Sequence, residues 1–489
     1  MKIITIIGSC FLGVVYLRNV LSFISIWRIK EYRFDRMFVH VRTNGWASWV
    51  WPNWRKPPIT PKTTALTILL FTIICIYITA TQGNIIVRLI ISNLLLFPVS
   101  ALLVMVLAIP TYLVHWWKIR KATSILRRQQ HLLVIGITGS YGKTSIKEYL
   151  SIILSTRYIV LKTEGSKNSP IAIAELVLRE LTPQHEIFIV EMGAYKTGEI
   201  ARMTAMVRPS IGIVTAINEQ HQDLFGSIEQ TMKAKYELIQ GLRGKRIGIF
   251  NSSNAKTCEM TAWAQHDHVH IWTYAGACRD VRSERIFTAS NIHPRLQTLT
   301  FTCIEGQSAA SVSANVVGEH KVGNILAAIA ASVAAGMTLN DACRLTANIT
   351  SLPDILKITN GTNEAVFIND TSNNNPDAAI AALNVLSKYH GRKFLVFQPM
   401  IELGKYSDSG HEKVAAHAAR ICTEIYLTNN NFRTPFFTGI QRSGITVPVR
   451  VMSTKDIVRY FRKILTAKDA VLFKGKEAGR VLDILRKSR

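Results

Sequence analysis

The residues best suited to chemistry lie at positions 132–150, in the stretch LLVIGITGSYGKTSIKEYL. An apolar run predicts a buried strand at 132–137, a glycine turn follows it, and Lys143-Thr144 opens a helical pattern. Turns of this kind bind phosphate through backbone N–H groups and a helix N-terminus, while the lysine reaches the outer phosphates and the threonine hydroxyl ligates Mg²⁺. Ile137 stands where the common motif has its first glycine, so a plain strand-to-helix turn is the alternative.

Polar residues also follow three later predicted strands. Glu191 ends the strand at 187–191, Asn218 and His221 follow the strand at 211–217, and Asn251 follows the strand at 247–250. Strands that alternate with helices predict a mainly parallel sheet, and ligands bind beyond the carboxyl ends of its strands. We therefore expect these side chains beside the phosphate turn, where a carboxylate and a histidine suit a metal ion. Taken singly, each residue would more simply cap or hydrogen-bond a loop.

A second α/β domain is expected after a boundary near residue 350. The pattern continues with a β-rich region at 271–313 and an alanine-rich helix at 324–336, then restarts near Pro353. Further strands are predicted at 365–368, 393–397, 424–427 and 470–473. The expected domains are 1–130, 131–350 and 351–489.

Composition narrows the class of partner. The chain has 489 residues, with 58 Lys and Arg against 32 Asp and Glu and a formal net charge of +26. Such a balance suits nucleic acid, an anionic membrane face or phosphorylated substrates. Without a zinc, homeodomain or RNP pattern, no nucleic-acid partner is expected. The seven cysteines show no CxxC spacing and are interpreted as free thiols in a reducing compartment.

The first 130 residues predict a membrane anchor. The segments 3–27, 63–80 and 85–117 are each long and apolar enough to span a bilayer. The loop 28–62 and the residues after 117 are rich in Lys and Arg, whereas the link 81–84 is uncharged. The positive-inside rule then places the catalytic domains in the cytoplasm of a multi-pass inner-membrane protein. The tryptophan-rich stretch 46–54 lies either on the inner headgroups or in an ordinary loop.

From residue 132 onward the chain resembles the Mur ligases, most of all the D-alanyl-D-alanine-adding branch, MurF. The resemblance rests on motifs in order: GITGSYGKTS at 136–145, EMGAYKTGEI at 191–200, Asn218 to His221 with FGS at 225–227, AKYELI at 234–239, GEHKVGNILAA at 318–328, NDTSNNNP at 369–376 and MIELG at 400–404. It implies an α/β fold with a P-loop-type central domain and a Rossmann-like C-terminal domain, preceded here by three transmembrane helices.

The resemblance also implies roles for single residues. Lys143, Lys235 and His221 would be catalytic, with Lys235 carbamylated so that it becomes a metal ligand. The metal ligands would then be Thr144, Glu191, His221 and Lys235. ATP would be bound by Thr138, Gly139, Ser140, Gly142, Lys143, Thr144, Ser145, Asn251, Asn324 and Asp370. Substrate would be bound by Asn168, His320 and Asn375.

The implied activity is ATP- and Mg²⁺-dependent amide-bond formation in peptidoglycan precursor synthesis. A carboxylate is activated as an acyl phosphate, and an amine then displaces phosphate. The family's Pro-x-Arg is Pro353-Asp354-Ile355 here, its GDM is Gln398-Pro399-Met400, and its DDSYNANP is NDTSNNNP. These changes leave the identity of the amine open.

Membrane helices are expected in place of the family's UDP-sugar domain. We therefore expect an acyl substrate that is lipid-linked or is held by a partner protein that supplies a sugar-binding domain, with a soluble small-molecule precursor as the alternative. Two other functions remain open. One is a MurT-like amidating ligase with a glutaminase partner, against which the missing CxxC argues; the other is an inactive membrane scaffold.

Overall fold

The computed structural model describes residues 2–486, except 31, 33, 35–36, 38–46, 166, 195, 219–225, 280, 373, 401–402 and 404–405. The chain divides into two compact units, Met1–Trp117 and Lys118–Arg489. Each unit has its own core, and each is described here by itself.

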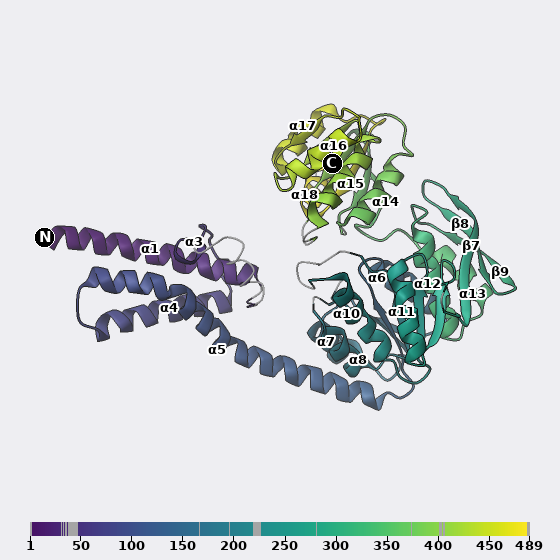
Figure 1. The fold of residues 1–489 in the computed structure, drawn as a ribbon, viewed down its shortest axis with the longest axis horizontal. Coiled ribbons are helices and arrows are strands. Elements are labelled where there is room, and N and C mark those ends of the chain that lie inside the picture. Colours follow the sequence, from purple (N-terminus) through teal and green to yellow (C-terminus); the bar gives the residue numbers. More distant parts are fainter. Residues whose placement is uncertain are drawn as a thin grey trace. The chain divides into compact units, whose positions relative to one another are not determined.

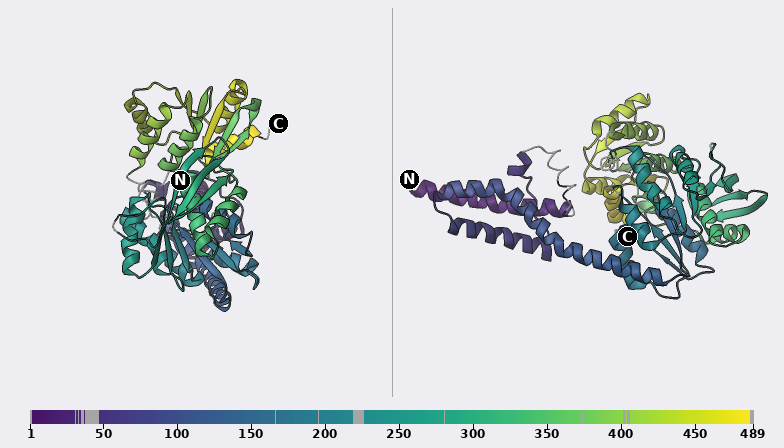
Figure 2. Two further views of the ribbon diagram at one scale, coloured as in Figure 1. Left: turned by 90° about the vertical axis from the view of Figure 1, so that its right-hand side faces the viewer. Right: turned by 60° about the horizontal axis from the view of Figure 1, so that its bottom comes forward.

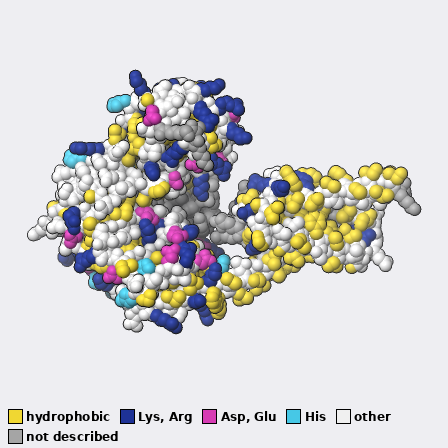
Figure 3. Space-filling view, turned by 180° about the vertical axis from the view of Figure 1, so that it is seen from behind, with side chains coloured by type: hydrophobic (Ala, Val, Ile, Leu, Met, Phe, Trp, Pro, Cys, Tyr) yellow, Lys and Arg dark blue, Asp and Glu magenta, His cyan; other side chains and the backbone are white. Residues whose placement is uncertain are grey.

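Three long helices build the first unit: α1 (Lys2–Ile29), α4 (Pro61–Ala80) and the first part of α5 (Ile85–Arg128), with a short α3 (Ala47–Val50) between α1 and α4. All three are long and apolar enough to cross a membrane. Their facing sides share a core that includes Val20, Phe23, Leu70 and Leu96. Hydrophobic side chains also cover most of the visible outer face of this unit (Figure 3), as expected of helices surrounded by lipid.

A polar cluster explains how α1 accommodates a charge within its apolar sequence. The Arg18 guanidinium donates to Asn19 Oδ1 at 2.9 Å and to the Pro52 carbonyl at 3.1 Å, and it stacks on the Trp51 ring at 4.3 Å. Asn19 in turn donates to Asn93 of α5 at 3.2 Å. Buried polar groups that pair with one another lower the cost of placing them inside a bundle.

The second unit begins with a nine-stranded sheet in the order β2-β3-β1-β4-β5-β6-β7-β8-β9 (Figure 1). The strands are β1 (Leu133–Thr138), β2 (Val160–Lys162), β3 (Ile187–Glu191), β4 (Ile211–Val214), β5 (Ile247–Asn251), β6 (His270–Tyr274), β7 (Arg285–Pro294), β8 (Leu299–Glu305) and β9 (Ser308–Ala314). In this order, every neighbouring pair from β2 through β1 to β7 is parallel, as the alternation of strands and helices predicted. Strands β7, β8 and β9 are antiparallel and form the far edge of the sheet (Figure 2).

Helices cover both faces of this sheet. They are α6 (Lys143–Leu154), α7 (Pro170–Glu180), α8 (Glu199–Val207), α10 (Ile228–Gln240), α11 (Ala255–His266), α12 (Lys321–Ala334) and α13 (Leu339–Leu345), with the 3₁₀ turn η1 (Thr346–Asn348). Ile135 and Ile137 of β1 pack against α6 and α12, while Val134 packs with α7, α8 and α10 on the other face. Gly136 also lies on this second face, and a Cβ there would come within 2.5 Å of Leu238 Cδ1 of α10. The glycine therefore allows the close packing of α10 on β1.

A six-stranded sheet follows, in the order β10-β11-β15-β12-β13-β14. Its elements are β10 (Lys357–Asn360), the 3₁₀ turn η2 (Thr362–Glu364), β11 (Val366–Asp370), α14 (Pro376–Leu386), β12 (Lys393–Phe397), α15 (Ser407–Ala419), β13 (Glu424–Leu427), α16 (Arg433–Arg442), β14 (Val449–Val451), α17 (Thr454–Ile464), β15 (Ala470–Lys474) and α18 (Lys476–Arg486). All strand pairs are parallel except β10 with β11. Helices α14, α15 and α16 cover one face, and α17 and α18 cover the other.

One sequence prediction is wrong: not all seven cysteines are free. Cys258 on α11 and Cys278, which follows β6, form a disulfide with Cα atoms 5.4 Å apart. Strands β5 and β6 are parallel neighbours, with Asn251 opposite Tyr274, so the segments that follow them lie side by side. The 20-residue separation shows nothing of this contact, because it arises from strand pairing. The other five cysteines, Cys10, Cys75, Cys303, Cys343 and Cys422, are free.

Candidate active site

The phosphate loop joins β1 to α6 through two glycines in conformations that other residues rarely adopt. Gly139 has φ +139° and Gly142 has φ +85°. A Cβ on Gly139 would lie 2.0 Å from Thr215 Oγ1, and one on Gly142 would lie 2.9 Å from Asn324 Oδ1. The end of β4 supports the turn, because Ser140 N donates to the Ala216 carbonyl at 2.7 Å. The loop is thus held in the form that exposes backbone N–H groups at a helix N-terminus, which suits a phosphate group.

We expect Gly139→Ala to lower the melting temperature and to abolish ADP binding, because the added methyl group meets Thr215 and the backbone of Ala216. Gly306→Ala is the matched control. It shares a positive φ of +58°, but its added Cβ has no neighbour within 4 Å. Thermal unfolding and calorimetric titration with ADP measure the two effects. Equal melting temperatures and equal ADP affinities in the two variants would show that the close approach to Thr215 is unimportant.

Glu191, at the carboxyl end of β3, is the centre of a buried polar cluster. Its Oε2 accepts from Thr144 Oγ1 at 3.0 Å, and its Oε1 accepts from Asn168 Nδ2 at 3.1 Å. The Lys147 ammonium lies 3.2 Å from the same Oε2. Three predicted site residues, Thr144, Asn168 and Glu191, are therefore in direct contact.

Lys147 is a member of this cluster that the sequence analysis missed. Its side chain is fully buried, and its ammonium also lies 3.4 Å from Glu148 Oε1 and donates to the Gly165 carbonyl. Helical spacing was the available signal, because residues three and four apart share one face of a helix. Lys143, Thr144 and Lys147 of α6 stand in that relation.

Two further lysines, Lys143 and Lys235, influence each other electrostatically. The Lys143 ammonium donates to the carbonyls of Gly139 at 2.6 Å and Ser140 at 3.2 Å. Burial lowers the pKa of Lys143, and the charge of Glu191 partly opposes this shift. Lys235 of α10 is only 3 % exposed. Burial and then the charge of Lys143 lower the pKa of Lys235 to about 7, so a large fraction of its amine is neutral at physiological pH.

The predicted metal site can be compared with the structure only in part, because His221 lies outside the described residues. Among the residues that are described, no group of three or more His, Cys, Asp or Glu side chains could hold a metal ion. The Thr144 hydroxyl and the Glu191 carboxylate do supply adjacent oxygen atoms, the ligand type that Mg²⁺ prefers. Thr144 and Glu191 therefore fit a Mg²⁺ ion whose remaining ligands come from groups other than these two side chains.

A cavity of about 190 Å³ lies next to the phosphate loop and brings together five predicted site residues from both sheets of this unit: Gly142, Ser145, His320, Asn324 and Asp370. The Asp370 carboxylate forms a buried ion pair with Lys474, at the end of β15. Desolvation at the cavity wall, with the charges of Lys321 and Lys474, lowers the pKa of His320, which favours the neutral imidazole at pH 7. Burial is also the main cause that lowers the pKa of Lys321 to about 8.

Asn251 and Asn375 are among the predicted site residues that do not line this cavity. Asn251 donates through Nδ2 to the Thr215 carbonyl at 2.7 Å, and its Oδ1 accepts from Ser253 N at 3.0 Å. Asn375 is 1 % exposed, and its Oδ1 caps α14 by accepting from Ala378 N at 2.9 Å. Of the remaining loop residues, Thr138 Oγ1 donates to the Met192 carbonyl at 3.0 Å.

The positions that depart from the family motifs contact one another or their neighbours. Asn369 Nδ2 donates to Asp354 Oδ1 at 2.7 Å, so two of the changed positions form a pair. Gln398 Oε1 accepts from Glu477 N at 2.9 Å, at the first turn of α18. These substitutions are therefore integrated into the fold of the C-terminal domain.

Comparison with known proteins agrees with this architecture. Residues 137–332 match the Mur ligase middle domain, and residues 356–477 match the domain described as Mur ligase, glutamate ligase domain. The chain is 32% identical, over 60% of its length, to the UDP-N-acetylmuramoyl-tripeptide--D-alanyl-D-alanine ligase of Escherichia coli K12. It spans 64% of the length of that relative, slightly less than two thirds.

Solved structures support the fold. A crystal structure of MurF from Acinetobacter baumannii matches with a TM-score of 0.68 and 24% identity, over 76% of this chain and 81% of that one. MurF ligase from Thermotoga maritima in complex with ADP matches with a TM-score of 0.64 and 20% identity, over 76% and 83%. With the middle and C-terminal domains both present and in order, the chain belongs to the Mur ligase family.

Proposed function

We propose that this chain is an ATP- and Mg²⁺-dependent, MurF-like ligase that joins the carboxylate of a peptidoglycan-type precursor to a D-alanyl-D-alanine-like amine. The observation that carries the proposal is the cluster of Thr144 and Glu191 beside a loop whose two glycines have positive φ, with Lys235 buried nearby. The family relationship and the E. coli relative of that name support it.

The side chains would share the work as follows. Lys143 would neutralise charge on the outer phosphates, and Thr144, Glu191, His221 and carbamylated Lys235 would hold Mg²⁺. When bound, ATP with Mg²⁺ supplies the phosphoryl group that activates the substrate carboxylate. Asn168 and Lys147 orient Glu191 through its two oxygens.

The cavity residues would select the nucleotide and the substrate. Asn324 and Asp370 line the cavity beside Gly142, where the base and ribose would lie. His320 is neutral at pH 7, so one of its ring nitrogens can donate a hydrogen bond to substrate while the other accepts one. Asn375, the N-cap residue of α14, would contribute to substrate binding from the start of that helix.

The test is a ligation assay on the full chain in detergent, with ATP, Mg²⁺, UDP-N-acetylmuramoyl tripeptide and D-alanyl-D-alanine. We expect phosphate release and a product whose mass has increased by one D-alanyl-D-alanine minus water. A product formed only with ammonium as the amine would identify an amidating ligase instead. No ATP consumption with any precursor or amine would indicate a scaffold.

We also propose that the three apolar helices anchor the ligase in the inner membrane with its catalytic domains in the cytoplasm. The helices have the required length and composition, and the basic residues lie in the loop 28–62 and after residue 117. On this arrangement the acyl substrate is lipid-linked, or a partner protein presents it. Adding a lipid-linked precursor to the same assay would test which precursor form is preferred.

Topology provides a separate prediction. A reporter fused after Asn84 should report the periplasmic side, and one fused after Lys121 should report the cytoplasm, because cations are retained on the inner side. Paired phosphatase and fluorescent-protein fusions at both sites measure this directly. A cytoplasmic signal from the Asn84 fusion would contradict the arrangement with three spanning helices.

A further inference from the structure

A basic hollow lies at the amino ends of the strands of the middle domain, on the edge of the sheet opposite the candidate active site. It comprises two adjoining cavities of about 380 and 530 Å³, and both are lined by Arg127, Arg208 and Arg243. The start of β1 and Ser210, just before β4, also line the cavity of about 380 Å³. The phosphate loop, by contrast, follows the carboxyl end of β1, so the hollow does not belong to the candidate active site.

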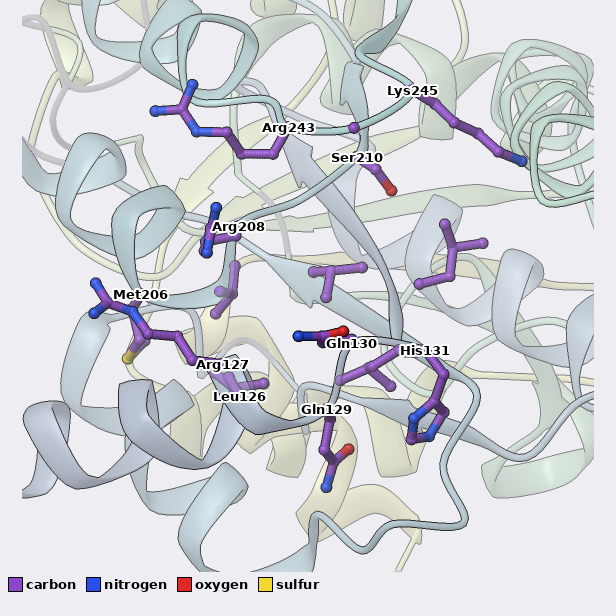
Figure 4. A pocket seen from close by; sticks show the side chains of 15 residues that line it. Leu126, Arg127, Gln129, Gln130, His131, Met206, Arg208, Ser210, Arg243 and Lys245 are labelled. Carbon is purple, nitrogen blue, oxygen red and sulfur yellow. The ribbon is translucent and has the colours of Figure 1, made fainter.

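The three arginines come from separate elements that the fold brings together. Arg127 is near the end of α5, Arg208 is the C-cap of α8, and Arg243 lies in the turn between α10 and β5. In Figure 4 their side chains lie on the same side of the cavity, while Lys245 and His131 lie on the other side. This concentration of charge depends on tertiary structure, because the three residues are distant in sequence.

No described carboxylate forms an ion pair with any of these three guanidinium groups, all of which are exposed. Glu237 is the one carboxylate among the described residues that line the two cavities. Its two oxygens accept from Gly198 N at 2.5 Å and Ala201 N at 2.9 Å, so its charge is engaged at the start of α8. The lining therefore carries the cations of Arg127, Arg208, Arg243 and Lys245 against the one carboxylate of Glu237, and this excess of positive charge favours an anion.

The position of Arg127 along the chain favours an anion at the membrane surface. Arg127 lies ten residues after Trp117, the last residue of the apolar run in α5. At the helical rise this corresponds to about 15 Å along α5. Arginine binds phosphate groups with two parallel hydrogen bonds, and inner-leaflet membranes carry phosphate-bearing anionic lipids.

We propose that Arg127, Arg208 and Arg243 form a binding site for the phosphate headgroup of an anionic phospholipid at the inner membrane surface. The site holds the middle domain against the membrane by an edge that is separate from the candidate active site. This inference goes beyond the proposed ligase function, since lipid binding needs neither ATP nor an acyl substrate.

Hydrogen–deuterium exchange on the full chain in nanodiscs tests the proposal. Discs of phosphatidylcholine alone are compared with discs that also contain phosphatidylglycerol. We expect phosphatidylglycerol to slow exchange in peptides that cover residues 126–134, 206–210 and 241–246. The triple variant Arg127→Gln, Arg208→Gln, Arg243→Gln should lose this protection.

The matched control is Lys388→Gln, Arg420→Gln, Arg462→Gln, which removes three exposed cations from the C-terminal domain and should keep the protection. Arg208 has φ +51°, so if the triple variant does not fold, the double variant Arg127→Gln, Arg243→Gln replaces it. Lys143→Ala should also keep the protection, which separates this site from catalysis.

Three results would overturn the proposal. The first is equal exchange in the two kinds of disc, and the second is protection that survives in the arginine variant. The third is the same protection from inorganic phosphate added to phosphatidylcholine discs, which would assign the hollow to a soluble phosphate.

Discussion

Lys143→Ala is expected to reduce ligase turnover on the order of 10²-fold or more, because removing one preorganised charge from a developing anion typically costs that much. Lys143 begins α6 directly after Gly142, and among the described residues its ammonium donates hydrogen bonds to the loop carbonyls of Gly139 and Ser140. The cation is therefore available to bound phosphates. Phosphate release and product formation by the full chain in detergent measure the loss.

Folding should survive this substitution, since Lys143 is only half-buried and lies at a turn. Lys256→Ala on α11 is the control, because that half-buried lysine pairs with the exposed Glu259 at 2.7 Å and should retain activity. Equal melting temperatures for both variants would show that the loss is chemical. Turnover of Lys143→Ala at the wild-type level would mean that the loop has a structural role only.

Lys235→Ala is expected to lose activity by at least about 10²-fold, because a carbamylated lysine would contribute directly to the Mg²⁺ site. Short carboxylates such as acetate should restore part of the activity by occupying the vacated position. Lys235→Arg should stay inactive with acetate, because its guanidinium remains charged and fills the space. Lys233→Ala, an exposed lysine on the same helix α10, is the matched control and should keep full activity.

The lowered pKa of Lys235 makes the same assignment testable through pH. Carbamylation requires the neutral amine, and with a pKa of about 7 the neutral fraction rises from about one tenth at pH 6 to about nine tenths at pH 8. After removal of CO₂, reactivation at a fixed CO₂ pressure should therefore be about tenfold faster at pH 8. Full activity in Lys235→Arg, or reactivation at equal rates, would show that this lysine is not carbamylated.

Much of the ligase fold follows from the sequence because its strands are buried on both faces. The strands at 187–191, 393–397 and 424–427 were predicted with the same bounds that the structure has. Parallel strands of this kind form continuous apolar runs, and the polar residues that end them mark the ligand edge of the sheet. Thr144 and Glu191 were expected together on this basis, and they are in contact.

Other features were decided only by tertiary structure, because they join residues whose separation in sequence carries no signal. The Cys258–Cys278 disulfide depends on the parallel pairing of β5 and β6. The ion pair of Asp370 with Lys474 depends on the pairing of β11 with β15 across about a hundred residues of chain. The three arginines of the basic hollow meet because α5, α8 and the α10–β5 turn all lie at one edge of the sheet, a consequence of helix packing that local patterns do not contain.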